Sequence, residues 1–303
     1  MLTPSPLPSS SGPGALLKQR VWAGRVPVVF SLDPNEVTTL HAPRPFYAMV
    51  PRMSYLVSQT RDVVEYFRDA APPMSAMQGA SIWFEAKGVP LHWHLPFGLL
   101  RDLLCGPGAD GDADLPWTLT VHFLNYPKDV LLPCENEQSV ESHFMHSLKQ
   151  ATFLRMGSTK AVMALPEAQQ TQIWTSISQN DYESYREATH ELHLDGGVDA
   201  SALRHLPLRV HLDNAPAIQM PIAPLQSGRE KTLLEVLNYL LPDLFPPDIP
   251  DAAASHAQTH TYQLVVHGIP VPADVSVVEL YRNFAYADGF LYVAVLPHPS
   301  KTR

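Results

Sequence analysis

The 303-residue sequence contains only two cysteines, Cys105 and Cys134, too few for a disulfide framework or a zinc-finger set. We therefore expect a reduced, cytoplasmic environment. No segment approaches the roughly 20 apolar residues that a membrane-spanning helix needs, and the amino terminus does not have the basic and apolar pattern of a secretory signal. These absences argue against secretion and against insertion into a membrane.

Basic residues are also scarce, because 21 Lys and Arg stand against 30 Asp and Glu, a formal net charge of −9. An acidic chain does not offer the bulk positive surface on which most nucleic-acid binding depends, so we expect no nucleic-acid partner. The P-loop and H-E-x-x-H signatures of nucleotide and zinc-protease sites are missing as well. We therefore predict no catalytic residues, no cofactor and no metal site.

Proline, in contrast, is abundant: 30 of 303 residues, about twice the usual share of roughly 5%. Such a content favours short elements joined by rigid turns. Residues 1–14, rich in Pro, Ser and Gly, are predicted to form a disordered tail, because they have little apolar surface to bury. Residues 15–24 begin with a short helical pattern containing Leu16 and Leu17, which must dock on another part of the protein to be stable.

Residues 25–134 follow the order strand, strand, helix, strand, strand, helix, strand, which is the order of a ubiquitin-like β-grasp domain. The predicted strands span residues 25–32, 46–53, 82–85, 90–94 and 117–123, and the predicted helices span 58–69 and 97–104. The acidic, glycine-rich stretch 106–114 precedes the last strand. It does not have the closing glutamate of an EF-hand loop, so we interpret it as a solvated loop insertion.

Residues 135–198 change to helical periodicity, with Pro166 opening one helix and Asp181 capping another. Residues 205–299 then repeat the first pattern, with strands at 206–212, 217–222, 262–267 and 290–296. Two helices begin at the capping sequences Thr232 to Glu235 and Ser276 to Glu279. We therefore predict an α+β protein in which two ubiquitin-like β-grasp domains flank a helix-rich domain, with a short N-terminal helix. We also expect these parts to pack into one body.

Lys128 stands out among the seven lysines because it follows Pro127 directly after a predicted strand. Proline has no N–H to continue a sheet, so Lys128 and Asp129 should lie on an exposed turn outside the sheet. The ordinary interpretation of an exposed lysine is a solvated surface charge. A lysine held this way could also serve as a nucleophile.

Other chemistry-bearing residues have plainer interpretations. His92 and His94 share a face of a predicted strand, but without a third ligand they are better explained as structural or partner-contacting side chains. Cys134 lies near Lys128 in the sequence and could be a thioester cysteine. Nothing around it in the sequence would lower the pKa of its thiol, so this interpretation is weak.

Eight segments, taken in order, resemble the autophagy protein 5 family, which accepts a ubiquitin-like modifier. They lie at residues 21–27, 51–56, 82–85, 91–100, 115–123, 172–174, 267–269 and 288–291. The resemblance covers nearly all of the chain after residue 20. The turn at Pro127 departs from the family pattern by lacking one residue between the proline and the lysine. Lys128 is the only lysine between Lys87 and Lys149, and so remains the only candidate there.

The resemblance implies a scaffold rather than an enzyme, with ligase-like activity only as part of a conjugate. It implies that autophagy protein 12 is joined through an isopeptide bond to Lys128 by conjugating enzymes of the same system. It further implies that the conjugate holds a helix of autophagy protein 16 and promotes lipidation of the autophagy protein 8 family. Peripheral contact at the preautophagosomal structure membrane follows from the same resemblance. For the partner helix we predict a groove that includes Leu16, Leu17 and Trp22.

Two alternatives remain open. The chain could be a ubiquitin-like modifier, which would need processing because it ends in Pro297 to Arg303 without a terminal diglycine. It could instead be a hydrolase or transferase, which would need a cysteine and a histidine within hydrogen-bond reach in a cleft.

Overall fold

In the sheet of the first ubiquitin-like domain, alternate residues of the first strand face the core. The computed structural model describes residues 13–73, 82–106, 115–192, 200–212, 215–247 and 261–297. In β1 (Arg25–Leu32), Val26, Val28, Phe30 and Leu32 face the core. The sheet has the order β2-β1-β5-β3-β4, and the neighbours of β1 are antiparallel β2 (Phe46–Pro51) and parallel β5 (Trp117–His122). β3 (Trp83–Ala86) and β4 (Val89–Pro90) complete it.

Two predicted elements of this domain are shorter than the sequence pattern indicated. The helix predicted at 58–69 is two helices, α2 (Leu56–Gln59) and α3 (Arg61–Phe67). They separate at Thr60, whose hydroxyl donates to the carbonyl of Val57 at 3.3 Å and so competes with helical hydrogen bonding. The strand predicted at 90–94 ends with Pro90, and the chain turns where the N–H of Leu95 donates to the carbonyl of His92.

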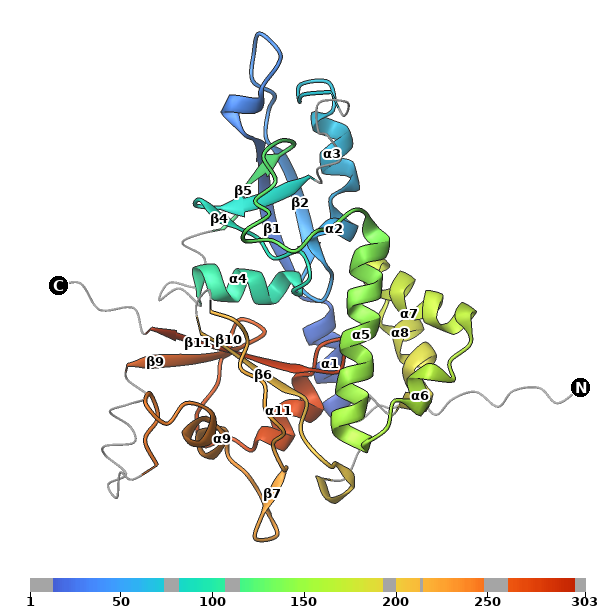
Figure 1. The fold of residues 1–303 in the computed structure, drawn as a ribbon, viewed down its shortest axis with the longest axis vertical. Helices are drawn as coiled ribbons and strands as arrows, with labels where there is room; N and C mark the ends of the chain where they lie inside the picture. Colours follow the sequence, from blue (N-terminus) through green and yellow to red (C-terminus); the bar gives the residue numbers. More distant parts are fainter. Residues whose placement is uncertain are drawn as a thin grey trace, which may run out of the picture.

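Helices α4 and α5 link the first domain to the rest of the protein. α4 (Phe97–Cys105) lies between the two sheets and contacts strand β11 (Leu291–Pro297) of the second domain (Figure 1). α5 (Glu137–Met156) stands upright beside both domains (Figure 1). The helical domain continues with α6 (Lys160–Met163), α7 (Glu167–Gln179) and α8 (Tyr182–Thr189). As predicted, Pro166 precedes α7, and Asp181 caps α8 by accepting from the N–H of Ser184.

The second ubiquitin-like domain repeats the arrangement with the sheet order β10-β9-β11-β6. Its central strand β11 (Leu291–Pro297) runs parallel to β6 (Leu208–Leu212) and antiparallel to β9 (Tyr262–Val266), and β10 is Ile269–Pro270. Helices α9 (Leu233–Leu240) and α11 (Val277–Phe284) begin at the predicted caps Thr232 and Ser276. A small hairpin, β7 (Leu225–Gln226) and β8 (Arg229–Glu230), precedes α9.

The strand predicted at 217–222 is not regular in the structure. Only two isolated bridges pair this segment with the chain at β6, from Ile218 to Val210 and from Ile222 to Leu206. Pro216 and Pro221 supply no N–H for a ladder, which explains why the pairing is interrupted. The segment nevertheless occupies the sheet edge that β2 occupies in the first domain.

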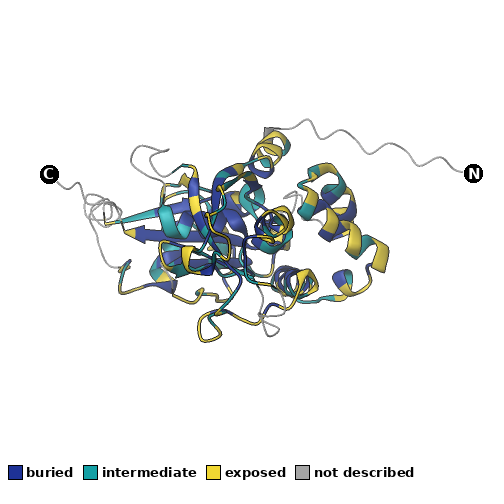
Figure 2. Ribbon diagram, turned by 90° about the horizontal axis from the view of Figure 1, so that it is seen from above, coloured by how far each residue is buried: buried dark blue, intermediate teal, exposed yellow. Residues whose placement is uncertain are grey.

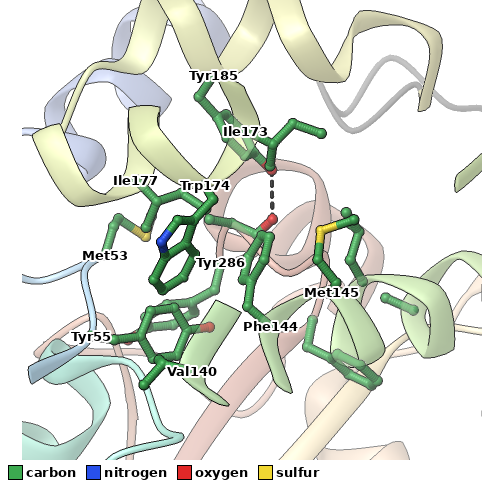
Figure 3. Packing of buried hydrophobic residues seen from close by; sticks show 14 of the residues in the cluster. Met53, Tyr55, Val140, Phe144, Met145, Ile173, Trp174, Ile177, Tyr185 and Tyr286 are labelled. Atoms are coloured by element: carbon green, nitrogen blue, oxygen red, sulfur yellow. Dashed lines mark hydrogen bonds between the residues drawn. The ribbon is translucent and has the colours of Figure 1, made fainter. Parts of the chain in front are cut away.

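One hydrophobic core joins the N-terminal helix α1 (Pro13–Trp22) and all three domains. Tyr55 of the first domain packs on Phe144 and Trp174 of the helical domain, with ring centroids 6.1 and 5.9 Å away (Figure 3). Tyr286 and Tyr292 of the second domain belong to the same cluster. Exposed residues lie mainly on the outer faces of the helices, whereas the strands are largely buried (Figure 2). The prediction that the parts pack into one body is therefore confirmed.

An ion pair within the first ubiquitin-like domain lies against the second domain and forms a further contact between them. The guanidinium of Arg52 donates to both carboxylate oxygens of Asp102 at 2.5 and 2.6 Å. Gly268, in the turn between β9 and β10, approaches this guanidinium so closely that a Cβ there would lie 3.2 Å from it. With its φ of +76°, this position requires glycine both for its backbone and for the close approach.

Candidate functional site

The C-terminal end of β5 leads into the loop that carries Lys128. A buried carboxylate holds the first residues of this loop. Glu36, which is 5% exposed, accepts from the N–H of Phe123 at 2.5 Å and from the N–H of Leu124 at 3.2 Å. Hydrogen bonds to a carboxylate are stronger than those between neutral groups. Glu36 therefore fixes the direction in which the chain leaves the sheet.

Three aromatic side chains then hold the loop at two carbonyl groups. The indole of Trp83 donates to the carbonyl of Leu124 at 2.8 Å. The carbonyl of Leu132 accepts from the indole of Trp93 at 2.8 Å and from the hydroxyl of Tyr126 at 2.5 Å. Burial raises the pKa of Tyr126 to about 12, so this hydroxyl keeps its proton and remains a donor.

Lys128 lies at the tip of this braced loop with its side chain exposed. Its N–H donates to the carbonyl of Tyr126 at 2.9 Å, and Pro127 accepts from Val130 and Leu131 at 3.0 and 2.9 Å. The next residue, Asp129, is exposed as well. The amine thus projects outward from a backbone with several internal hydrogen bonds.

The other described lysines differ from Lys128 in their setting. Lys87 and Lys160 are also exposed, but Lys87 lies in the tight turn between β3 and β4, and Lys160 begins the short helix α6. Lys18, Lys149 and Lys231 are half-buried, and Lys301 lies outside the described residues. Lys87 and Lys231 directly follow the short strands β3 and β8, whereas Lys128 lies on the longer loop between β5 and α5.

Cys134 does not have the surroundings of a reactive thiol. Its side chain is buried and donates to the carbonyl of Asn136 at 3.7 Å. Burial raises the pKa of this thiol to about 11, which keeps it protonated at neutral pH. This geometry disfavours the alternative of a cysteine and histidine hydrolase.

Asp33, Glu36 and His122 form a group of metal-ligating type at the base of the loop, with one ligand atom each within 4.8 Å of the others. The Nδ1 of His122 lies 3.1 Å from Asp33 and 3.6 Å from Glu36, and its ring stacks on Trp83 with centroids 3.9 Å apart. Pairing between the imidazole and the carboxylates accounts for this geometry. The group is therefore best described as part of the support of the loop.

The structure does not bring the three predicted groove residues onto one surface. Leu16 and Leu17 are exposed on α1, at 56% and 36%. Trp22 is 4% exposed and packs on Tyr182 and Tyr185, with ring centroids 5.6 and 4.6 Å away. Trp22 therefore anchors the helix, and the groove itself remains a prediction.

Two sequence motifs also receive a structural setting. His92 and His94 lie in the turn after β4 rather than on a strand, with their ring centroids 5.5 Å apart. Gly106, Gly108 and Gly111 also have the spacing G-x-G-x-x-G, which was not considered among the sequence motifs. In chain order this stretch comes after α4 and before β5, the reverse of the dinucleotide-binding order. Residues 107–114, and with them most of the acidic insertion, lie outside the described part of the chain, as do residues 193–199 with Gly196 and Gly197.

Sequence reasoning missed the residues that brace the loop. Glu36 lies 87 residues before Phe123, and Trp93 lies 39 residues before Leu132. Neither contact leaves a periodic or spaced pattern in the sequence. The tryptophan content of the domain was visible, but the partner of each indole N–H depends on the fold.

Two β-grasp sheets joined by a helical bundle define a protein with tandem ubiquitin-like domains. Family models described as autophagy protein ATG5 match this chain: the UblA domain over residues 21–123, the alpha-helical bundle region over 137–195 and the UblB domain over 205–295. The chain is 31% identical to autophagy protein 5 of Phaeosphaeria nodorum over 313 residues, covering 92% of this chain and 96% of that protein. It belongs to the autophagy protein 5 family.

Two further comparisons agree with this assignment. Autophagy protein 5 of Arabidopsis thaliana is 38% identical over 172 residues, which covers 57% of this chain and 48% of the relative. The crystal structure of Kluyveromyces marxianus Atg5 superposes with a TM-score of 0.73 at 24% identity, covering 92% of this chain and 98% of that chain. The latter likeness shows that the fold is shared. Among the described helices, none has the length and apolar character needed to cross a bilayer.

Proposed function

We propose that this chain is the acceptor of autophagy protein 12, joined through an isopeptide bond to Lys128, and that it acts as a scaffold rather than as an enzyme. The observation that carries the proposal is the exposed amine at the tip of a braced loop. In this reaction the amine attacks the thioester carbonyl of the conjugating enzyme and the carbon–sulfur bond breaks. The enzyme's thiol is released with the proton that the amine loses as the amide forms. A firm backbone reduces the entropy lost when the amine is placed against the thioester.

Activation of the amine is expected to come from the conjugating enzyme. A lysine amine in water is almost wholly protonated at neutral pH, so attack requires a proton acceptor or desolvation. Asp129 is next to Lys128, but a carboxylate favours the protonated amine. We assign Asp129 to binding or orienting the enzyme. The finished conjugate, with a bound helix of autophagy protein 16, would promote lipidation of autophagy protein 8 family members while in peripheral contact with the preautophagosomal membrane.

Substitution of the proposed acceptor tests the assignment. Lys128→Arg keeps the charge but replaces the amine with a much poorer nucleophile, so conjugation should be lost while the fold is unchanged. Intact-mass analysis of protein from its own cells would show whether a species larger by one small protein is present. The matched control is Lys87→Arg, another exposed lysine at a turn, which should be conjugated normally. Conjugation of Lys128→Arg at the normal rate would show that another lysine is the acceptor.

The proposed site for the partner helix is tested at α1. Leu16→Ser together with Leu17→Ser removes exposed apolar surface without touching Trp22, and so leaves the anchor of the helix intact. Binding of an amphipathic helical peptide from autophagy protein 16 should weaken by about tenfold, as measured by calorimetry. The exposed apolar residue Met163, on α6, provides the control variant Met163→Ser. Equal affinity of the double variant and the control would remove α1 from the site.

A further inference from the structure

A cavity of about 440 Å³ lies where the two ubiquitin-like domains and α5 meet. The turn after β4 and helix α4 form one side, α5 another, and β6 with the segment after it a third. Val130 and Leu132, from the loop that carries Lys128, complete the wall. This volume falls within the range of roughly 300 to 1,000 Å³ that is typical of small-molecule sites.

The polar part of this cavity consists of basic side chains. Four histidines and one arginine line it: His92, His94, His143, His211 and Arg209. None of the described residues in its wall carries a carboxylate. The remainder of the wall is mainly aliphatic and includes Leu95, Leu100, Leu103 and Leu104. The cavity therefore combines an apolar surface with a group of potential cations.

Two of these imidazoles each have one ring nitrogen that forms no hydrogen bond within the described part of the protein. Within the described part of the protein, His94 Nδ1 and His211 Nε2 are buried and have no hydrogen-bond partner. His211 is only 4% exposed. A buried polar atom without a partner is destabilising, so a ligand that supplied partners would recover that cost.

Basic groups and no acidic ones are the neighbours that shift the pKa of both imidazoles. Burial, followed in order by His143, His92, Arg209 and His211, lowers the pKa of His94 to about 3. Burial lowers the pKa of His211 to about 4, with Arg209 and His92 as the other causes. The rings are close, since the centroids of His94 and His143 lie 4.9 Å apart and Tyr292 of β11 lies 5.7 Å from His211.

Arg209 is held as a fixed charge at the edge of the cavity. Its guanidinium donates to the Tyr292 hydroxyl at 2.8 Å and to Gln150 at 2.9 Å, and it lies 3.7 Å from the ring centre of Phe290. Arg209 also forms an ion pair at 3.9 Å with Asp288, which is 1% exposed and is not part of the cavity wall. The positive charge of Arg209 nevertheless lowers the pKa of both His94 and His211.

We propose that this cavity binds a small amphipathic carboxylate, whose head group contacts His94 and His211 and whose apolar chain lies against the leucines of α4. An unpartnered ring nitrogen that carries a hydrogen can donate to a carboxylate oxygen. An entering anion favours the protonated imidazoles, so binding takes up protons. Its affinity therefore rises as the pH falls through the range into which the bound anion raises the pKa of an imidazole.

Calorimetric titration of the full-length protein with octanoate tests the proposal, and acetate and octanol serve as the anion-only and chain-only probes. Octanoate should bind saturably with one site, at least about tenfold more tightly than either probe. Its affinity should be higher at about pH 6 than at about pH 8, since octanoate itself stays ionised at both. Binding of octanol as tight as that of octanoate, or absence of saturation, would overturn the proposal.

Matched variants locate the site. His94→Gln combined with His211→Gln should weaken octanoate binding by at least about tenfold and remove its pH dependence. His146→Gln, an exposed histidine of α5, should leave both unchanged. Circular dichroism checks that each variant is folded. If the double variant does not fold, NMR of the labelled imidazoles in the unmodified protein decides, because unshifted His94 and His211 signals at saturating octanoate contradict the assignment.

Discussion

At the contacts between domains, individual titratable side chains are packed closely and are shielded from water. His267 shows this most clearly, because it lies in the β9–β10 turn with its ring stacked on Tyr286 at 3.9 Å and its Nε2 2.9 Å from the carbonyl of Phe284. Burial, with the positive charge of Arg52, lowers the pKa of His267 to about 3. The imidazole is therefore neutral in the folded protein throughout the physiological range.

This burial predicts a loss of stability in acid. In the unfolded chain His267 binds a proton below a pH near 6.5, whereas the folded chain does not bind it until about pH 3. The free energy of unfolding should fall by up to about 1.4 kcal/mol per pH unit between these values for this group. His267→Gln keeps a donor for the carbonyl of Phe284. It should reduce the slope of the free energy of unfolding against pH, measured by urea titrations at several pH values. The exposed His190→Gln should keep the original slope, and an unchanged slope in His267→Gln would contradict the prediction.

Among helices, strands and loops, the structure shows how a strand end becomes a firm platform. β5 is central in its sheet, between β1 and β3, and the loop that follows it is held by Glu36, Trp83 and Trp93. Because these contacts come from different elements, the loop is ordered by the fold rather than by its own composition.

Removing the carboxylate at the start of the loop should loosen it. Glu36→Gln replaces a charged acceptor of two backbone N–H groups with a neutral one, so the amides of Phe123 and Leu124 should exchange hydrogen faster by about tenfold. Hydrogen exchange with mass spectrometry measures this effect. Glu65→Gln, at an exposed position on α3, is the control and should leave the loop peptide unchanged. Equal protection in both variants would mean that Glu36 does not hold the loop.

Across the entire protein, the shared aromatic core predicts that the three domains unfold together. Phe144 is fully buried between Tyr55 and Trp174, so Phe144→Ala should cost about 3–5 kcal/mol. Because the cluster contains residues of every domain, scanning calorimetry should show one transition at a lower temperature. Phe153→Ala, at a half-exposed position of the same helix, should change the stability by less than about 0.5 kcal/mol. Separate transitions for the domains would contradict a common core.

Features that depend on neighbours in the chain could be predicted from the sequence. Alternation of apolar residues indicated most strands, and the sequence from Thr232 to Glu235 indicated a helix start, where the structure has a complete capping box. The exposed turn at Lys128 could also be predicted from Pro127, although the sheet pairing of β5 already ends at His122. The alternating apolar residues at 217–222 predicted a regular strand. That prediction gave too little weight to the flanking and internal prolines, which interrupt the pairing.

Features that depend on distant segments required the fold. Nothing in the local pattern distinguishes exposed Leu16 from buried Trp22, since both are apolar residues of one short helix, and only the helical domain covers the tryptophan. The hydrogen bond from Phe123 to Glu36 and the close approach of Gly268 to Arg52 join segments far apart in the chain. The histidines of the cavity likewise come from three separate elements. Such groups interact through space, and their separation in sequence carries no physical signal of that interaction.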